Sequence, residues 1–87
     1  MTDWTALAPG TTEEVDDDGT TVRVHHPKEG VFIIRRFFDG AWQNAVWIFP
    51  VSDVWSVSRK SDSLGIRADD LPSAIDKGVV LSREATR

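Results

Sequence analysis

The chain has 87 residues and a net charge of −4, with 40% hydrophobic and 28% charged residues. This length and composition are typical of a single soluble globular domain. Cysteine is absent from the sequence, which excludes disulfides and thiolate metal sites. We recognise neither a signal peptide nor an apolar run of roughly 20 residues, the length that spans a bilayer. We therefore expect a cytoplasmic protein with no membrane contact.

Acidic residues are concentrated at the start of the chain. Residues 1–20 contain six aspartates and glutamates and no lysine or arginine. Because a charge run of this kind is usually solvated, we expect residues 1–19 to form an acidic, partly flexible arm. Residues 20–87 are then expected to form a single folded domain.

Turn-forming residues recur at regular intervals in the first half of the chain. Glycines at positions 10, 19, 30 and 40 each lie in a stretch typical of turns, namely Pro9-Gly10, Asp18-Gly19, residues 27–30 and Asp39-Gly40. The β-rich runs between them predict an antiparallel meander with strands at residues 20–26, 31–38 and 41–49. A further strand at residues 11–15 is left open. The pair Asp39-Gly40 is typical of a two-residue type I′ turn.

Counting outward from this turn, with His26 placed opposite Val31, assigns the side chains of the strands to two faces. One face is aliphatic and aromatic: Val22, Val24, Val31, Ile33, Phe37, Trp42, Val46 and Ile48. The second face mixes cations with aromatic residues: Arg23, His25, Phe32, Ile34, Arg36, Phe38, Gln43 and Trp47. A one-residue change in the loop 27–30 would move the first strand to the other face.

The spacing of the apolar residues along the chain changes after Pro50. The spacing allows either a helix from 52 to 62 or a fourth strand. A later helix is expected to start at Asp69 or Asp70, with Pro72 in its first turn and a stop at Lys77-Gly78. Residues 79–81 fit either a last strand or the tail of a longer helix. The predicted fold is therefore α+β, a small antiparallel β-meander of three to four strands with one or two short C-terminal helices packed on one face.

Both faces of the predicted sheet are apolar, although a sheet in water needs only one such face. Leaving Phe32, Ile34, Phe38 and Trp47 in water would forfeit roughly 6–12 kcal/mol, so something should cover them. The candidates are the arm through Trp4 and Leu7, a helix, a second copy of the chain or another protein. An arginine buried on this face would need a carboxylate partner, which the acidic arm can supply.

No set of catalytic, cofactor-binding or metal-binding residues can be assembled. His25 and His26 are neighbours on one strand and point to opposite faces, so they cannot chelate one metal. Asp16-Asp17-Asp18-Gly19 lacks the ligand spacing of a calcium loop. With no motif for nucleophilic or phosphate chemistry, we expect no enzyme activity and no cofactor.

These observations favour a non-catalytic protein-binding module. The expected contact surface is the second face, acting in homodimerisation or in binding a partner or host protein, as in a phage-type accessory or inhibitor. The alternative is single-stranded nucleic-acid binding by the same aromatic and basic face. With Thr20 to Gln43 as its strands, the layout resembles the single-stranded-DNA-binding coactivators of the positive cofactor 4 family. The isoelectric point near 4.9 disfavours a nucleic-acid partner.

Overall fold

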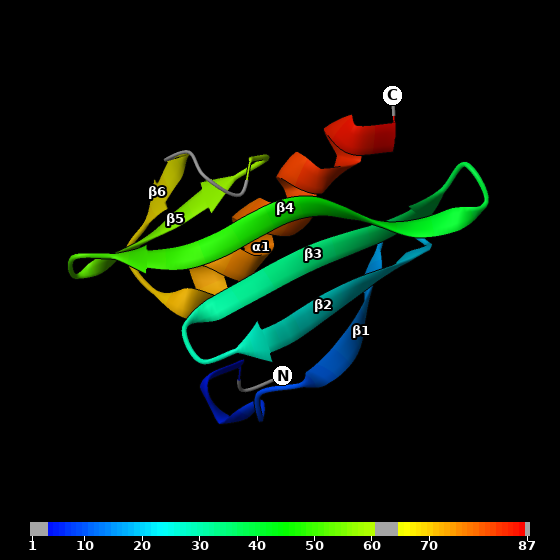
Figure 1. Cartoon of the computed structure of the whole chain (residues 1–87). Coiled ribbons are helices and arrows are strands. Elements are labelled where there is room, and N and C mark those ends of the chain that lie inside the picture. Colours follow the sequence, from blue (N-terminus) through cyan, green and yellow to red (C-terminus); the bar gives the residue numbers. More distant parts are fainter. Residues whose placement is uncertain (1–3, 61–64, 87) are drawn as a thin grey trace.

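The protein folds as one six-stranded antiparallel sheet with a helix packed on one face (Figure 1). The computed structural model describes residues 4–60 and 65–86. Neighbouring strands in the sheet are also neighbours in the chain. The strands are β1 (Thr11–Asp17), β2 (Thr20–Lys28), β3 (Val31–Phe38), β4 (Ala41–Val51), β5 (Val54–Ser58) and β6 (Ile66–Ala68). The helix α1 (Leu71–Ser82) follows β6, and short 3-10 turns η1 (Trp4–Ala6) and η2 (Arg83–Thr86) lie near the two ends.

The predicted α+β class, with an antiparallel meander and a helix on one face, is confirmed, but the predicted number of strands is too low. The weak run near residue 11 is a full strand, so part of the acidic arm belongs to the sheet. The ambiguous segment from 52 to 62 contains a strand at Val54–Ser58, and its last two positions lie outside the described residues. β6 has only three residues, too few for alternation to be recognised.

The tight turns between the strands have the expected chemistry. Asp39 and Gly40 both have positive φ, 54° and 80°, as a type I′ turn requires. Asp18 and Gly19 repeat this geometry between β1 and β2, with φ of 53° and 87°. Both hairpins are therefore set by an aspartate-glycine pair.

The helix begins where the sequence predicts and ends later. The Asp70 side chain accepts a hydrogen bond from the Ser73 amide at 2.8 Å, and Pro72 lies in the first turn. The predicted stop at Lys77-Gly78 is wrong, because α1 continues to Ser82. A Cβ atom at Gly78 would lie 2.9 Å from Ile48 Cδ1. This glycine allows the helix to approach the sheet closely and does not cap it.

The observed faces of the sheet differ from the predicted ones because the strand pairing contains two shifts of one residue. Between β2 and β3, Val24 pairs with Ile34 instead of Ile33, because the register shifts between His25 and Lys28. Between β3 and β4, the register shifts again next to Ile34, which pairs with Val46 instead of Ala45. Each shift moves all following side chains to the opposite face.

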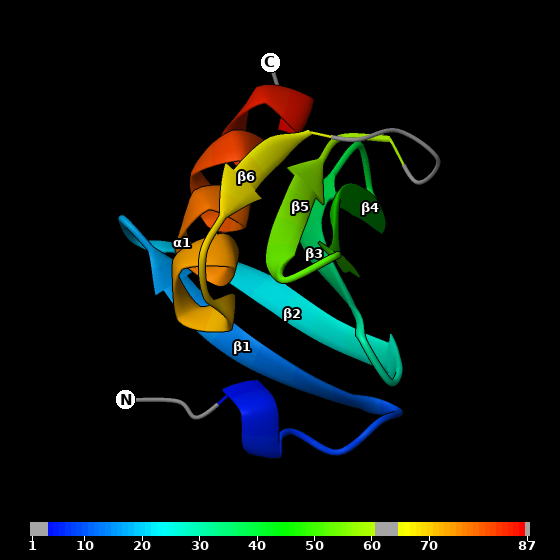
Figure 2. The ribbon, with the colours of Figure 1, turned by 90° about the vertical axis from the view of Figure 1, so that its left-hand side faces the viewer.

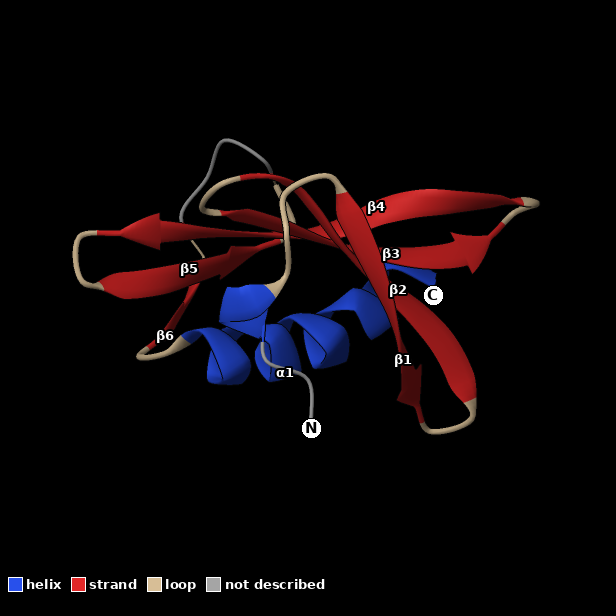
Figure 3. Cartoon of the chain, turned by 90° about the horizontal axis from the view of Figure 1, so that it is seen from below, coloured by secondary structure: helices blue, strands red, loops and turns tan. Residues whose placement is uncertain are grey.

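The core lies between α1 and one face of the sheet (Figure 2). Leu71, Ala74 and Ile75 of the helix pack there against the sheet. The sheet contributes Val22, Val24, Phe32, Ile34, Val46, Ile48 and Val57. Figure 3 shows α1 lying along this face while the sheet twists past it. No helix in the described ranges is long and apolar enough to cross a membrane.

Trp4 of η1 completes the core from the edge of the sheet. It is buried, and Leu7 packs beside it on the helix side of the sheet. His26 fixes this segment, because its Nδ1 lies 2.9 Å from the Leu7 carbonyl oxygen. The start of the described chain therefore covers the same face as α1 and leaves the opposite face open.

Candidate protein-binding surface

The face of the sheet that α1 does not cover is called the open face here. It faces the viewer in Figure 1, with α1 behind the sheet. The strand pairings place nine side chains of β2, β3 and β4 on it: Arg23, His25, Ile33, Arg35, Phe37, Trp42, Asn44, Trp47 and Phe49. Four of these are aromatic and two are arginines. A cation and aromatic surface of the predicted kind therefore exists, but mostly with different members.

A cluster of one cation and two aromatic rings lies on the open face near the β3–β4 turn. The guanidinium carbon of Arg23 lies 4.0 Å from the centroid of the Trp42 ring. Phe37 meets the same ring edge to face, with centroids 5.7 Å apart. Phe37 is 57% exposed, the largest exposure among the aromatic residues of this face. A partner with an apolar side chain would find a preformed platform there.

Polar contacts hold the arginines of the open face in place. Arg23 Nε donates to Glu14 Oε2 at 3.1 Å, and Arg35 Nε donates to Asn44 Oδ1 at 2.8 Å. These contacts leave further guanidinium N–H groups of each arginine for an outside acceptor. Because both cations are already oriented, less side-chain entropy would be lost when a partner binds.

His25 adds a neutral polar group to the open face. Its Nδ1 lies 2.9 Å from Thr12 Oγ1. Burial, together with the positive charge of Arg35, lowers the pKa of His25 below its ordinary value of 6.5. The imidazole is therefore uncharged at neutral pH and does not add to the positive charge of the two arginines.

The structure divides the eight residues of the predicted site between the two faces. Arg23, His25 and Trp47 lie on the open face. The other five lie on the helix side: Phe32, Ile34, Arg36, Phe38 and Gln43. Phe32, Ile34 and Arg36 are buried within the chain, so they do not share an exposed face with Arg23, His25 and Trp47. These three side chains are covered within the chain itself, by α1 and the residues that follow it.

Six residues of the open face were not predicted as members of it. Ile33, Phe37 and Trp42 were assigned to the aliphatic face, and Arg35, Asn44 and Phe49 to neither set. Ile33 is only 8% exposed even though no helix covers it, since its large neighbours on the open face surround it. One sequence signal for this face was correct: the Asp39-Gly40 turn predicted the pairing of Phe37 with Trp42 that the structure shows.

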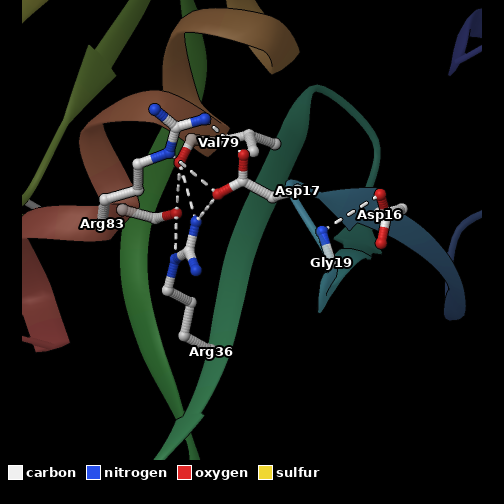
Figure 4. A network of polar contacts seen from close by, with 7 residues as sticks. Asp16, Asp17, Gly19, Arg36, Val79 and Arg83 are labelled. Atoms are coloured by element: carbon white, nitrogen blue, oxygen red, sulfur yellow. Dashed lines mark hydrogen bonds and ion pairs between the residues drawn. The ribbon is translucent and has the colours of Figure 1, made fainter.

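The buried arginine on the helix side belongs to a polar network with a structural role (Figure 4). Arg36 pairs with the carboxylate of Asp17 and donates to Ser82 Oγ at 2.7 Å. Arg83 donates to the same carboxylate through Nε at 3.0 Å. The expectation that the acidic arm supplies a carboxylate to a buried arginine is therefore confirmed. The network ties β1 and β3 to the end of α1.

The Asp17 carboxylate remains ionised in this network. Hydrogen bonds from Arg83 and Arg36, together with their charges, lower the pKa of Asp17 to about 2, although burial opposes the shift. The same pairing raises the pKa of Arg83. Asp17 is thus held between two arginines, and Arg36 in turn reaches Ser82 of α1.

The two histidines are separated as the sequence predicts. His26 points into the core, where it stacks on Phe32 with centroids 4.2 Å apart, while His25 points to the open face. Because a carbonyl oxygen can only accept, Nδ1 of His26 is the donor of its contact with Leu7. Nε2 is buried without a hydrogen-bond partner. Among the described residues, no group of three or more side chains is arranged to hold a metal ion.

Comparison with known proteins gives no family model, no curated protein and no solved structure that matches this chain. The open face combines aromatic rings and oriented arginines on the side of the sheet that α1 does not cover.

Proposed function

We propose that the protein is a non-catalytic protein-binding module and that the open face is its contact surface, used first for homodimerisation. The observation that supports this proposal is that Phe37, Trp42, Trp47 and Phe49 all lie on the sheet face that α1 does not cover. Tryptophan, phenylalanine and arginine are enriched at protein interfaces, and tryptophan and arginine dominate their binding energy. A rigid sheet presents these rings without a cost of backbone ordering.

The distribution of charge around the rings supports a contact between two copies of the chain. Glu14 and Asp16 of β1 border the open face, and Arg23 and Arg35 lie further in. A twofold contact requires a surface that is complementary to itself. A face with carboxylates and guanidinium groups around aromatic rings can meet that requirement, because each charge of one copy finds its opposite on the other.

The test is the mass in solution of the wild type and of Trp47→Ala, measured by light scattering after size-exclusion chromatography. We expect a wild-type dimer and a folded Trp47→Ala monomer, because removing the ring takes away buried contact area. Val80→Ala is the matched control, since Val80 is 55% exposed on α1, away from the open face. This control should remain a dimer.

Two outcomes would contradict the proposal in this form. A wild-type protein that is monomeric at every concentration rules out self-association. If Trp47→Ala unfolds instead of dissociating, then Trp47 acts in stability and not in contact. Far-ultraviolet circular dichroism of the variant separates unfolding from dissociation.

Single-stranded nucleic acid is the second candidate ligand of the open face. The placement of Arg23 against Trp42 favours it, because bases stack on aromatic rings while arginine contacts phosphate. The pairing of Arg23 with Glu14 and the acidic isoelectric point of 4.9 weigh against it. A nucleic-acid binder should bind a labelled oligonucleotide with an affinity that falls steeply with salt, and Arg35→Ala should reduce that slope.

A further inference from the structure

The first strand forms an uncovered edge of the sheet. β1 pairs with β2 on one side, and no described strand lies on its other side (Figure 2). Asp17 and Thr20 flank the two-residue turn, so this pair is hydrogen-bonded. In an antiparallel ladder every second residue then directs its backbone N–H and C=O away from the partner strand. For β1 these residues are Thr12, Glu14 and Asp16, and their outward groups form a template for another strand.

A groove lined by apolar and acidic residues runs beside this edge on the helix side of the sheet. It has a volume of about 320 Å³, and its lining includes Trp4, Val15, Ile75 and Val79. Figure 3 shows β1 passing beside α1 at this place. A strand added to the edge of β1 would direct every second side chain toward this groove. The groove therefore offers a place for apolar side chains at alternate positions.

The edge and the groove are strongly acidic. Glu13, Asp16, Asp18 and Asp76 form no ion pair with any described residue. Asp76 of α1 also lines the groove. Of the arginines near β1, Arg23 already pairs with Glu14, and Arg36 and Arg83 pair with Asp17. The electrostatic field of the carboxylates without an ion pair favours a positively charged ligand.

We propose that the edge of β1 binds an extended, lysine- or arginine-rich segment of a partner protein as an additional strand. Backbone hydrogen bonds to Thr12, Glu14 and Asp16 would supply affinity, and an apolar side chain in the groove would fix the register. Charge complementarity selects this occupant over a second copy, because two β1 edges would place carboxylates against carboxylates. The inference uses the backbone edge of β1, which borders the open face, and it does not depend on a partner bound to the rings of that face.

The first experiment uses a synthetic peptide in which valine alternates with lysine. We expect its binding to shift the amide resonances of Thr12, Glu14 and Asp16 and the indole resonance of Trp4. A peptide with glutamate in place of lysine should not bind, and added salt should weaken the lysine peptide. Shifts confined to the open face or to β6, equal binding of the acidic peptide, or no binding would each overturn the proposal.

A second experiment separates strand addition from simple attraction between charges. Two further peptides carry N-methyl groups, one on every valine and the other on every lysine. In an added strand only one of these two sets of amides faces β1, so one peptide should lose binding and the other should keep it. If both methylated peptides bind as well as the parent, then no backbone hydrogen bonds are formed and strand addition is wrong.

Variants of the protein test the contribution of charge at the groove. Asp76→Lys should weaken binding of the lysine peptide about fivefold, because an attractive exposed charge becomes a repulsive one. Asp53→Lys is the matched control, since it makes the same change of charge in the exposed β4–β5 turn. Equal effects of the two variants would contradict a specific groove. Trp47→Ala should leave peptide binding unchanged, so the two proposed surfaces can fail independently.

Discussion

The two faces of the sheet each hold an arginine paired with a carboxylate of β1, in opposite environments. On the helix side, the Arg36 and Asp17 side chains are only 6% and 7% exposed. On the open face, the Arg23 and Glu14 side chains are 39% and 57% exposed. The first pair is surrounded by further partners from α1, whereas the second lies beside a tryptophan ring at the surface.

This difference shows how the same residue types serve two purposes. Breaking a buried pair leaves a charge without water or partner, which is costly, so Arg36 is tied to the fold. An exposed pair contributes little to stability, because water screens both charges. Arg23 is therefore available for a contact with another molecule, and its pairing with Glu14 orients it without committing it to the fold.

The largest effect is expected from Arg36→Met, which removes the buried guanidinium and keeps most of the side-chain volume. Asp17 loses one of its two cations and the Ser82 hydroxyl loses a donor. We expect a loss of about 3 kcal/mol in the free energy of unfolding, measured by urea denaturation. Arg35→Met, on the same strand and the opposite face, should cost less than about 1 kcal/mol. Equal losses would show that the two environments do not differ energetically.

A smaller effect is expected from acid. The pKa of Asp17 falls from its ordinary value of 3.8 to about 2 in the folded protein. The stability linked to Asp17 is therefore fully present above about pH 4 and is lost as the pH falls toward 2, a change of about 2 kcal/mol. Urea denaturation at several pH values measures it. Asp17→Asn should flatten this slope; an unchanged slope in this variant would assign the effect to other carboxylates.

The smallest effect is expected from the pair on the open face. Arg23→Ala and Glu14→Ala should each lower the free energy of unfolding by less than about 1 kcal/mol, because both side chains are well exposed. The proposed dimer should dissociate more readily in Arg23→Ala than in the wild type, because the Trp42 ring loses the cation that lies over it. Sedimentation velocity measures this change. A stable dimer in Arg23→Ala would remove this arginine from the proposed contact.

The sequence determined the turns and the helix start, because these depend on a few neighbouring residues. Asp39-Gly40 and Asp70 have the predicted roles, each set by local backbone geometry or a local hydrogen bond. The strand pairings depend on residues far apart in the chain, and two shifts of one residue escaped prediction. Nothing in local chemistry marks Ala45 as the position where β4 gains a residue relative to β3.

The two shifts also explain which core residues were predicted correctly. Val22 and Val24 lie before the first shift, and Val46 and Ile48 lie after the second, so the errors cancel and all four are in the core. Phe37 and Trp42 lie between the shifts and were placed on the wrong face. The candidate site was therefore predicted in kind, as an aromatic and basic sheet face, but only Arg23, His25 and Trp47 were predicted as its members.

The row of carboxylates along β1 has a consequence for the behaviour of the protein at high concentration. Exposed sheet edges are where chains stack into fibrils. Negative charges repel one another when two such edges approach, so they keep the molecules apart at neutral pH. Replacing Glu13 and Asp16 with uncharged residues would remove this repulsion, so ordered aggregation of such a variant would begin at the edge that we propose as the strand-binding site.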